Sequence, residues 1–237
     1  MYYANGKKDE KMKGNIFKRV EPKYILNQKE YNDIQALLNE YFEKDIYFES
    51  KIANIYYDND NSDMLIESLE KPLFKKKIRL RSYGENDIVY LEVKEKYKGT
   101  VYKRRVKLTK DEYNDYLINK KITNSQIMKE LDYYINYYHL VPYIYVAYDR
   151  LSYYATSDSE FRITFDSNLR YRLNNLEISN DKETKKYFDN NKYIMEVKSL
   201  DSLPLWFTSY LSQNKIYPKS FSKVGSIYTK ERECRVC

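Results

Sequence analysis

Alternating charged and apolar residues constrain the fold of this chain more than any other feature of its sequence. In residues 75–84, KKKIRLRSYG, Arg79 and Arg81 alternate with Ile78 and Leu80, and Gly84 ends the segment. Side chains two residues apart on a strand point to the same face of a sheet. The pattern therefore predicts a β-strand with two guanidinium groups on one face and an apolar opposite face.

The alternation recurs in four more segments, which are residues 88–97, 142–154, 160–171 and 193–200. Each segment puts a pair or more of polar residues on one parity, and the opposite parity is mainly apolar. The polar residues are Glu92, Lys94, Tyr148, Arg150, Arg162, Thr164, Asp166, Glu196 and Lys198. Residues 99–108 alternate less cleanly, and there Val101, Lys103, Arg105 and Lys107 fall together. Several strands are thus predicted to gather cations and carboxylates on a common face.

The order of these segments predicts an α+β fold with an antiparallel sheet. Strand follows strand directly in the middle of the chain, which favours antiparallel pairing over alternating strand–helix units. We expect about eight strands, including 16–26, where Pro22 suggests a bulge or an edge, and 50–58. Helices are predicted near 27–42, where Asn27 and Glu30 resemble a capping box, and near 61–72, 125–139 and 203–214. A further short helix is predicted to begin at a cap formed by Thr109 and Glu112. Residues 217–229 are predicted to form a loop or a short extended piece.

Two interpretations of the charged face remain open on the pattern alone: a solvated face and a binding face. If the sheet closes on itself, the charges point inward, and unpaired buried cations would be prohibitive. They would require carboxylates, water and a multiply charged anion such as a polyphosphate chain. Glu92 and Glu196, together with either Glu21 or Asp166, would then be oxygen ligands for Mg²⁺ or Mn²⁺.

Composition limits the classes of protein to which the chain can belong. The 237 residues carry 42 Lys+Arg and 35 Asp+Glu, a formal charge of +7 that suits an anionic partner. The two cysteines, Cys234 and Cys237, exclude a disulfide-built secreted domain, and a redox or metal role for the pair is disfavoured. The polar residues 1–14 are expected to be flexible and contain no signal core, and no apolar run is long enough to span a membrane. We expect a cytoplasmic protein.

Some features have simple structural interpretations. Lys75, Lys76 and Lys77 are predicted to be a solvated beginning of their strand, although they could attract an anion. Tyrosines 133, 134, 137 and 138 are predicted to pack against the protein, as is the apolar stripe at 205–211. His139, the only histidine, is expected to be structural, since it lacks the partners that nucleophile activation requires.

Several motifs, in their order along the chain, resemble those of VTC domains. The motifs are RLRSYG, LEVKEKYKGTVYKRR, AYDR, RITFD, MEVK, PLWFTSYL and YPKSFSKVGSIY. VTC domains are the catalytic domains of polyphosphate polymerases of the vacuolar transporter chaperone type, within the triphosphate tunnel metalloenzymes. The resemblance covers residues 16–229. It implies a closed eight-stranded antiparallel β tunnel barrel with flanking helices, over residues 15–229, followed by a tail at 230–237.

The resemblance also implies an activity, which is transfer of the terminal phosphoryl group of ATP to a growing polyphosphate chain, with Mn²⁺ or Mg²⁺. The residues it implies for catalysis are Lys23, Arg79, Arg81, Lys94, Arg150, Arg162, Lys198 and Lys223. The implied phosphate-binding residues are Lys103, Arg105, Tyr148 and Ser222. Glu196 matches the metal-binding glutamate of the family, and Glu92 and Glu21 are the further candidate ligands. ATP and polyphosphate are the expected partners, and a membrane partner protein is left open.

Two alternatives to polymerisation are carried forward. Hydrolysis of tripolyphosphate or a nucleoside triphosphate would use nearly the same residues, with water as the nucleophile. Tunnel hydrolases carry two glutamates before the first-strand lysine, whereas this chain reads VEPKY with Glu21 alone. A non-catalytic polyphosphate-binding module is the second alternative. Nucleic-acid binding is disfavoured, because no signature of an RNA-binding module is found.

Overall fold

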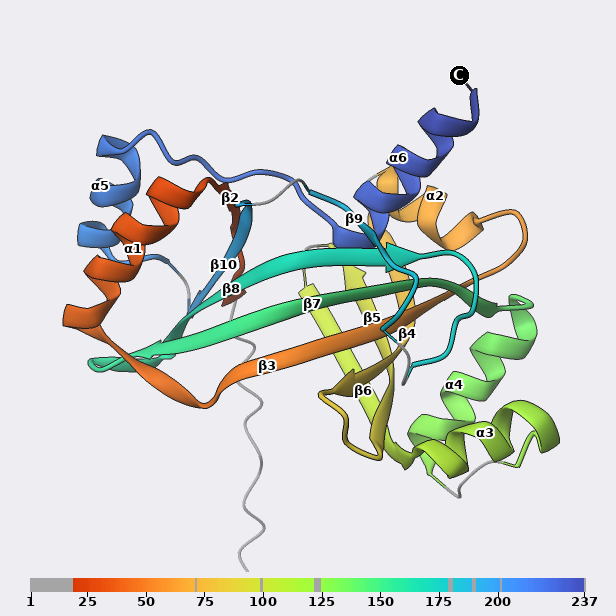
Figure 1. Cartoon of the computed structure of the whole chain (residues 1–237). Helices are drawn as coiled ribbons and strands as arrows, with labels where there is room; N and C mark the ends of the chain where they lie inside the picture. Colours follow the sequence, from red (N-terminus) through yellow and green to blue (C-terminus); the bar gives the residue numbers. More distant parts are fainter. Residues whose placement is uncertain are drawn as a thin grey trace, which may run out of the picture.

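A computed structural model describes residues 19–70, 72–98, 100–121, 125–178, 181–188, 191–200 and 202–236. Figure 1 shows their arrangement. The strands are β1 (Arg19–Val20), β2 (Lys23–Leu26), β3 (Phe42–Asp58), β4 (Phe74–Tyr83), β5 (Ile88–Tyr97), β6 (Thr100–Thr109), β7 (Val141–Ala155), β8 (Asp158–Arg172), β9 (Lys185–Lys186) and β10 (Tyr193–Leu200). The helices are α1 (Gln28–Tyr41), α2 (Asp63–Leu69), α3 (Lys110–Asn119), α4 (Gln126–Tyr137), α5 (Leu205–Gln213) and α6 (Lys223–Val236).

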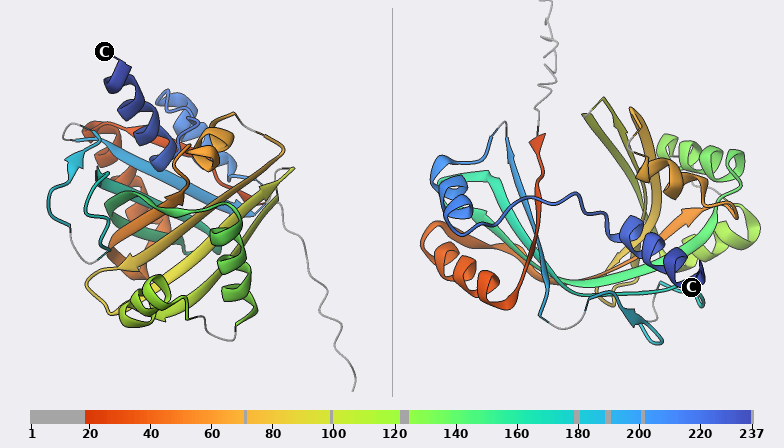
Figure 2. Two further views of the ribbon diagram at one scale, coloured as in Figure 1. Left: turned by 90° about the vertical axis from the view of Figure 1, so that its right-hand side faces the viewer. Right: turned by 90° about the horizontal axis from the view of Figure 1, so that it is seen from above.

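All strand pairs of the described chain are antiparallel and belong to one large sheet. The order along the sheet is β1-β10-β8-β7-β3-β4-β5-β6, with β2 also paired to β10 and β9 to β8. The predicted α+β class with an antiparallel sheet is therefore confirmed. Among the described strands, no ladder of hydrogen bonds joins β6 back to β1 or β2, so the predicted closed barrel is not confirmed. The sheet is instead strongly curved, with β2 and β10 on one arm and β4, β5 and β6 on the other (Figure 2).

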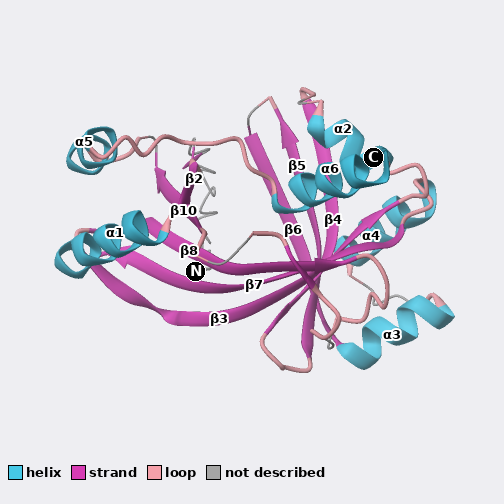
Figure 3. Cartoon of the chain, turned by 45° about the horizontal axis from the view of Figure 1, so that its top comes forward, coloured by secondary structure: helices cyan, strands magenta, loops and turns pink. Residues whose placement is uncertain are grey.

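Helices cover the convex face of this curved sheet on both arms (Figure 3). On one arm, α1 and α5 bury their apolar residues against outward-facing Met195, Val197 and Phe165. On the other arm, α3 and α4 pack against Ile78 and Leu80 of β4 and their neighbours in β5. Because strand side chains alternate, covering one parity leaves the other parity, with the charged residues, on the concave face.

The last helix, α6, packs against one end of the concave face. Its residues Val224, Ile227 and Tyr228 are buried with Ile144 and Val146 of β7. The prediction of a loop or extended piece at 217–229 is therefore wrong from residue 223 onward. These three residues have helical spacing, but the neighbouring Lys, Gly and Ser residues obscure the apolar stripe that identifies a helix.

A glycine allows α6 to lie close to α2, and the two helices lie side by side (Figure 3). A Cβ atom at Gly225 would lie only 3.1 Å from Cδ2 of Leu69 and 3.2 Å from Oγ of Ser222. The same stretch carries Ser222 and Lys223, so the contact between α6 and α2 also sets where these two polar residues lie.

Local sequence signals predicted several element boundaries correctly. Asn27 and Glu30 form the predicted capping box at the start of α1, and Thr109 and Glu112 form one at α3. Pro22 interrupts the first strand as expected, separating β1 from β2. Strand β3, by contrast, begins at Phe42, eight residues before the predicted 50, since it runs on directly from α1.

Two predictions of simple structural roles need correction. Lys76 is not solvated: it is 5% exposed, and its ammonium lies 3.2 Å from the ring centre of Tyr134 and 3.6 Å from a carboxylate oxygen of Glu95. Lys77 is half-buried on the concave face. On α4, Tyr133 and Tyr137 are exposed rather than packed. In the α5 stripe, Phe207 and Leu211 are buried as predicted.

Some predictions concern residues at the chain ends. The expected flexible segment 1–14 and Cys237 lie outside the described residues, while Cys234 is exposed on α6. No helix within the described ranges is long and apolar enough to cross a membrane.

Candidate functional site

Strand register places the charged residues of β4, β5 and β6 in transverse rows on the concave face. Arg79 lies opposite Glu92, which lies opposite Arg105 on the next strand. The neighbouring row follows two residues away along each strand and contains only lysines: Lys77, Lys94 and Lys103. Directly opposed side chains on adjacent strands lie within about 5.5 Å, so these groups interact strongly.

Glu92 is the buried counter-ion of the first row, with 1% of its side chain exposed. The Nε and Nη2 atoms of Arg79 lie 2.9 and 2.8 Å from its Oε2, and Nζ of Lys103 lies 2.9 Å from its Oε1. Nη1 of Arg105 is 3.9 Å away. Burial alone would raise the pKa of Glu92, but Arg79, Arg81 and Lys103 outweigh it and lower the pKa to about 2. Glu92 is therefore ionised at neutral pH.

Asp166 is a second buried counter-ion, on β8. Arg150 of β7 donates to both its oxygens, at 2.6 and 2.8 Å, and Nζ of Lys223 on α6 lies 2.5 Å from Oδ2. Burial opposes ionisation, yet Arg150 and Lys223 hold the pKa of Asp166 well below its usual range. Through this pair of contacts, α6 brings Lys223 onto the concave face.

Glu196 of β10 lies beside the Asp166 cluster and is less completely paired. Its Oε2 is 3.6 Å from Nη2 of Arg150, and it faces Lys23 of β2 across the strand pair. Burial would raise its pKa, but Lys198, Lys23, Lys223 and Arg150 together lower it to about 2. A buried carboxylate surrounded by cations in this way stays charged and can contact a further cation.

Arg81 differs from the other buried cations because all its hydrogen-bond acceptors are neutral. Its Nε donates to Oδ1 of Asn54 at 2.8 Å, its Nη2 to the hydroxyl of Tyr148 at 3.2 Å, and its Nη1 to the hydroxyl of Tyr83 at 3.5 Å. Among the described residues, no carboxylate oxygen lies within 4.0 Å of its guanidinium. The residue is 7% exposed. A buried cation that has no carboxylate in direct contact is costly and favours a bound anion.

Tyr56 of β3 adds a polar group beside the two arginines. Its hydroxyl accepts a hydrogen bond from Nη1 of Arg79 at 3.3 Å, and the residue is buried. Burial would raise the pKa of Tyr56, but Arg79, Arg81 and Lys77 outweigh it and lower the pKa to about 8. The lowered pKa shows how strongly positive this part of the concave face is.

The two arms of the sheet meet through long side chains. Nζ of Lys94 on β5 lies 3.8 Å from Oε2 of Glu21, which sits between β1 and β2 on the opposite arm. Lys23 of β2 donates from Nζ to the carbonyl oxygen of Phe221 at 3.4 Å, just before α6. Residues from both arms and from α6 therefore converge on one region.

The structure brings most of the sequence-predicted residues into this region, with one clear exception. Arg162 shares the concave parity but is exposed at one end of β8, where it bonds the carbonyl oxygen of Ser159 at 3.0 Å and lies 3.5 Å from Asp45. Two other predicted residues, Lys198 and Ser222, do join the cluster. Lys198 is half-buried beside Glu196, and Ser222 accepts a hydrogen bond from Lys77 at 3.0 Å.

The predicted metal ligands Glu196, Glu92 and Glu21 lie on different parts of the cluster. In the described part of the chain, no three His, Cys, Asp or Glu side chains approach closely enough to hold a metal ion. Glu92 is engaged by Arg79 and Lys103, and Glu21 lies near Lys94. Glu196 fits a metal best, because a Mg²⁺-type ion needs only one or two carboxylates when phosphate oxygens and water complete its coordination.

Sequence reasoning missed two residues of this cluster as binding groups, Asn54 and Tyr56. It also did not predict that Lys77 is half-buried or that Asp166 is paired with Arg150 and Lys223. Asn54 and Tyr56 lie in the segment predicted as strand 50–58, at the same parity as each other. The pairing of β3 with β4 determines which groups they lie beside. In that pairing, Asn54 lies opposite Arg81 and Tyr56 lies opposite Arg79. A neutral polar residue on a mainly apolar strand gives little signal without that register.

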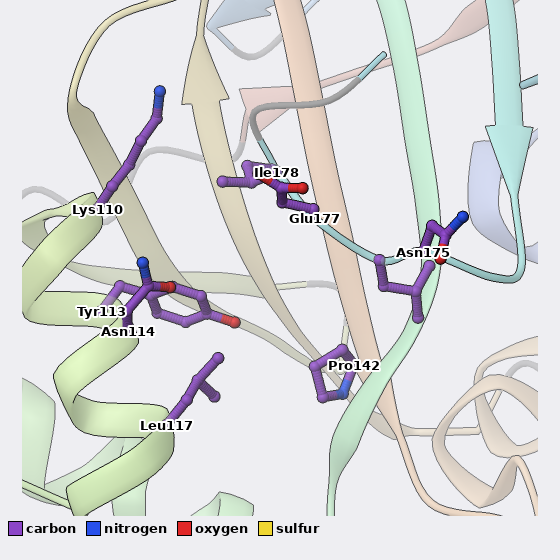
Figure 4. A pocket seen from close by; sticks show the side chains of 9 residues that line it. Lys110, Tyr113, Asn114, Leu117, Pro142, Asn175, Glu177 and Ile178 are labelled. Atoms are coloured by element: carbon purple, nitrogen blue, oxygen red, sulfur yellow. The ribbon is translucent and has the colours of Figure 1, made fainter. Parts of the chain in front are cut away.

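A second hollow lies on the other side of the sheet and lacks this concentration of charge (Figure 4). It encloses about 430 Å³ between α3 and the loop after β8, and Tyr113 and Ile178 line it. Both residues pack with the convex-face cluster. Lys110 and Glu177 are the charged residues of its lining, so opposite charges occur there in equal number. The concave face is the stronger candidate site.

Comparison with solved structures identifies the fold. A putative adenylate cyclase from Bacillus halodurans aligns with a TM-score of 0.54 at 14% identity, covering 86% of this chain and 93% of that chain. A putative adenylyl cyclase from Hippeastrum, described as having a dominant triphosphatase activity, aligns with a TM-score of 0.51 at 13% identity, covering 90% and 96%. At these identities the similarity concerns the fold alone.

Sequence comparison gives the family. Subunit 4 of the vacuolar transporter chaperone complex of Schizosaccharomyces pombe is 26% identical over 147 residues, which is 51% of this chain and 20% of that protein. This chain thus matches about one fifth of the length of that relative. The profile of the VTC domain matches residues 18–229, nearly the whole chain, in agreement with the resemblance seen in the motifs. The chain belongs to the VTC domain family.

Proposed function

We propose that the protein is a polyphosphate polymerase, which transfers the terminal phosphoryl group of ATP to a polyphosphate chain held on the concave face. Membership of the VTC domain family supports this proposal. The observation that carries it is Arg81, a buried guanidinium whose acceptors are all neutral. A polyanion lying beside Arg81 supplies the missing counter-charge, and the surrounding cations extend that site in both directions.

The proposed reaction needs positioned charges rather than a protein nucleophile. A terminal phosphate oxygen of the acceptor chain forms a bond to the γ-phosphorus of ATP, while the bond from that phosphorus to the β,γ-bridging oxygen breaks. The bonding electrons leave with ADP, and the chain gains one phosphate. Arg79, Arg81 and Arg150 hold the triphosphate and stabilise the charge that develops on the transferred group.

The remaining residues fall into two roles in this proposal. Lys223 and Lys198 line the path of the acceptor, next to the ionised Glu196. Glu196 would hold Mn²⁺ or Mg²⁺, which when bound neutralises phosphate oxygens in transfer reactions of this type. Glu92 and Asp166 keep Arg79, Arg150 and Lys223 in fixed orientations, because each carboxylate accepts from cations on other elements. We also propose that the two arms enclose the polyanion as a tunnel, with Lys94 and Glu21 meeting across the seam.

Product analysis tests the proposal. Purified protein is incubated with ATP and Mn²⁺ or Mg²⁺, with and without a short polyphosphate primer, and products are separated by gel electrophoresis. We expect metal-dependent long chains and ADP from the wild type and from Lys129→Met, which removes an equal charge from the exposed surface of α4. We expect at least a tenfold loss with Arg81→Met. Release of orthophosphate without chain growth would instead establish a hydrolase, and binding without turnover a binding module.

A further inference from the structure

Within the row of three lysines on the concave face, Lys77 has no role in the assignments above. Lys77, Lys94 and Lys103 lie directly opposite one another on β4, β5 and β6. Like charges in directly opposed positions destabilise a sheet. Lys103 is compensated by Glu92 at 2.9 Å, and Lys94 has Glu21 at 3.8 Å. Among the described residues, Lys77 has no carboxylate oxygen within 4.0 Å.

Lys77 is nevertheless held in a defined position inside the site. Its Nζ donates to Oγ of Ser222 at 3.0 Å, and the same Oγ lies 3.3 Å from the backbone nitrogen of Gly225, which donates to it. A lysine of this kind, half-buried and fixed by one neutral hydroxyl, keeps hydrogen-bond donors for a second acceptor. The contact joins β4 to the first turn of α6.

We infer that Lys77, with Lys94 and Ser222, forms a phosphate subsite that binds the end of the acceptor chain, separate from the arginine subsite that binds the nucleotide. This inference rests on the proposed polymerase function. The two subsites are ordered along β4: Lys77 precedes Arg79 by two residues and Arg81 by four. At about 3.3 Å per residue, Lys77 lies roughly 13 Å along the strand from Arg81, far enough for donor and acceptor phosphates to lie in sequence.

The electrostatic surroundings of Lys77 make the subsite responsive to an anion. The pKa of Lys77 is lowered to about 8, mainly by burial, while Tyr56 opposes this shift and the cations Lys75, Lys23 and Lys94 add to it. A phosphate beside Nζ would favour the ammonium form and raise that pKa again. Binding of the acceptor near pH 8 is therefore accompanied by uptake of a proton.

Calorimetry separates the two subsites. Orthophosphate is titrated into protein saturated with a non-hydrolysable ATP analogue, and the analogue is titrated in a separate experiment. For Lys77→Met we expect at least a tenfold loss of orthophosphate affinity and a change of less than about twofold in analogue affinity. The surface variant Lys129→Met, with the same loss of charge, should change neither. Equal losses for both ligands, or none for either, would overturn the separate subsite.

A second measurement tests the proton. Orthophosphate is titrated at pH 8 in two buffers with different ionisation enthalpies, which reveals proton uptake by the complex. Lys77→Arg should keep the affinity within about threefold of wild type but lose the proton uptake, because a guanidinium is always charged. Undiminished proton uptake in Lys77→Arg would assign the proton to another group and contradict the inference. If the wild type binds orthophosphate in this way but forms no chains, the polymerase proposal fails while the subsite remains.

Discussion

Two arginines two residues apart on one strand have opposite electrostatic situations. Arg79 is neutralised by Glu92, whereas Arg81 is bonded only to an amide and two phenols. Desolvation of a guanidinium is costly in both cases. Arg79 offsets that cost by direct contact with Glu92, whereas Arg81 interacts with the same carboxylate only at longer range. The difference means that Arg79 contributes to the stability of the fold, and Arg81 is available to a ligand.

The two arginines should therefore respond differently to replacement by methionine. Arg79→Met leaves Glu92 buried with Lys103 as its main partner, and we expect the free energy of unfolding to fall by about 3 kcal/mol. Arg81→Met loses its bond to Asn54 but also removes a buried charge that has no direct ion pair, so we expect a change of less than about 1 kcal/mol. Urea denaturation measures both. A larger loss of stability in Arg81→Met than in Arg79→Met would refute this division of roles.

The lowered pKa of Glu92 predicts how stability depends on pH. Its pKa is about 2 in the folded protein, below the value near 4.3 of an unfolded chain, so its contribution is full above about pH 4.3. The contribution is lost as the pH falls towards 2, and it amounts to about 3 kcal/mol. At pH 6 we expect Glu92→Gln to be less stable than wild type. Between pH 6 and pH 2, its free energy of unfolding should fall by about 3 kcal/mol less than that of wild type. Parallel pH profiles for the two proteins would contradict this.

The face of the sheet on which a residue lies could be predicted where charged and apolar residues alternate clearly. Alternation placed Arg79, Glu92 and Arg150 on one face, and the structure shows them there. It could not reveal that Lys77 is half-buried, because a run of lysines at the beginning of a strand looks solvated until α6 is known to cover it. The bond between Arg81 and Asn54 likewise depends on the pairing of two strands, which a single sequence does not specify.

At the scale of elements, α6 has two roles at once. Its apolar side, with Val224, Ile227 and Tyr228, fills one end of the concave face, and its first turn carries Lys223 to Asp166. The packing of the helix thus fixes the position of a charged group in the site. Loss of packing should consequently appear in anion binding as well as in stability.

Truncation of one side chain on α6 tests this coupling. Ile227 is completely buried, so Ile227→Ala should lower the free energy of unfolding by about 2 to 4 kcal/mol. At a temperature where the variant remains folded, we expect its affinity for tripolyphosphate to fall at least threefold. Lys230→Ala, on an exposed position of the same helix, is the control and should change stability by less than about 0.5 kcal/mol. Unchanged binding in a destabilised Ile227→Ala would show that α6 does not position Lys223.

Elements were predictable where capping and periodicity agreed. The Asn27 and Thr109 caps mark α1 and α3 in the sequence, and the structure retains both. Helix α6 was not predicted, because Lys, Ser and Gly surround its three buried residues. Its short apolar stripe can be recognised only when the end of the sheet against which it packs is known. Tertiary packing, rather than local preference, determines that helix.

The whole molecule is a curved sheet with two unjoined edges. Alternation of residues showed that one face is charged, but it carries no information on whether the first and last strands meet. In the structure they are linked by side chains such as Lys94 and Glu21 and not by a described ladder. The edge strand β6 carries Lys103, Arg104, Arg105 and Lys107, and such a charged edge disfavours pairing with another chain.

A polyanion that contacts both arms should hold them together. We expect tripolyphosphate at 100 times its Kd to stabilise the protein by about 2.7 kcal/mol, and 0.5 M salt to weaken its binding. Hydrogen exchange should slow at the amides of β2 and β6, where ladder bonds are incomplete, and this slowing should be absent in Arg81→Met. Protection confined to the central strands β3 and β7 would show that the ligand does not bridge the arms.

The open seam between β2 and β6 has a consequence for handling a long polymer. A ring of continuous strands admits a chain only by threading one of its ends, which becomes slow as the chain lengthens. Along this seam no described strand ladder joins the walls, so they can part there without breaking one. The segment before α6, where the backbone nitrogen of Lys219 donates to the carbonyl oxygen of Lys23, moves with them. If the proposed function holds, a polymer whose two ends are both remote is then loaded and released sideways, in mid-chain.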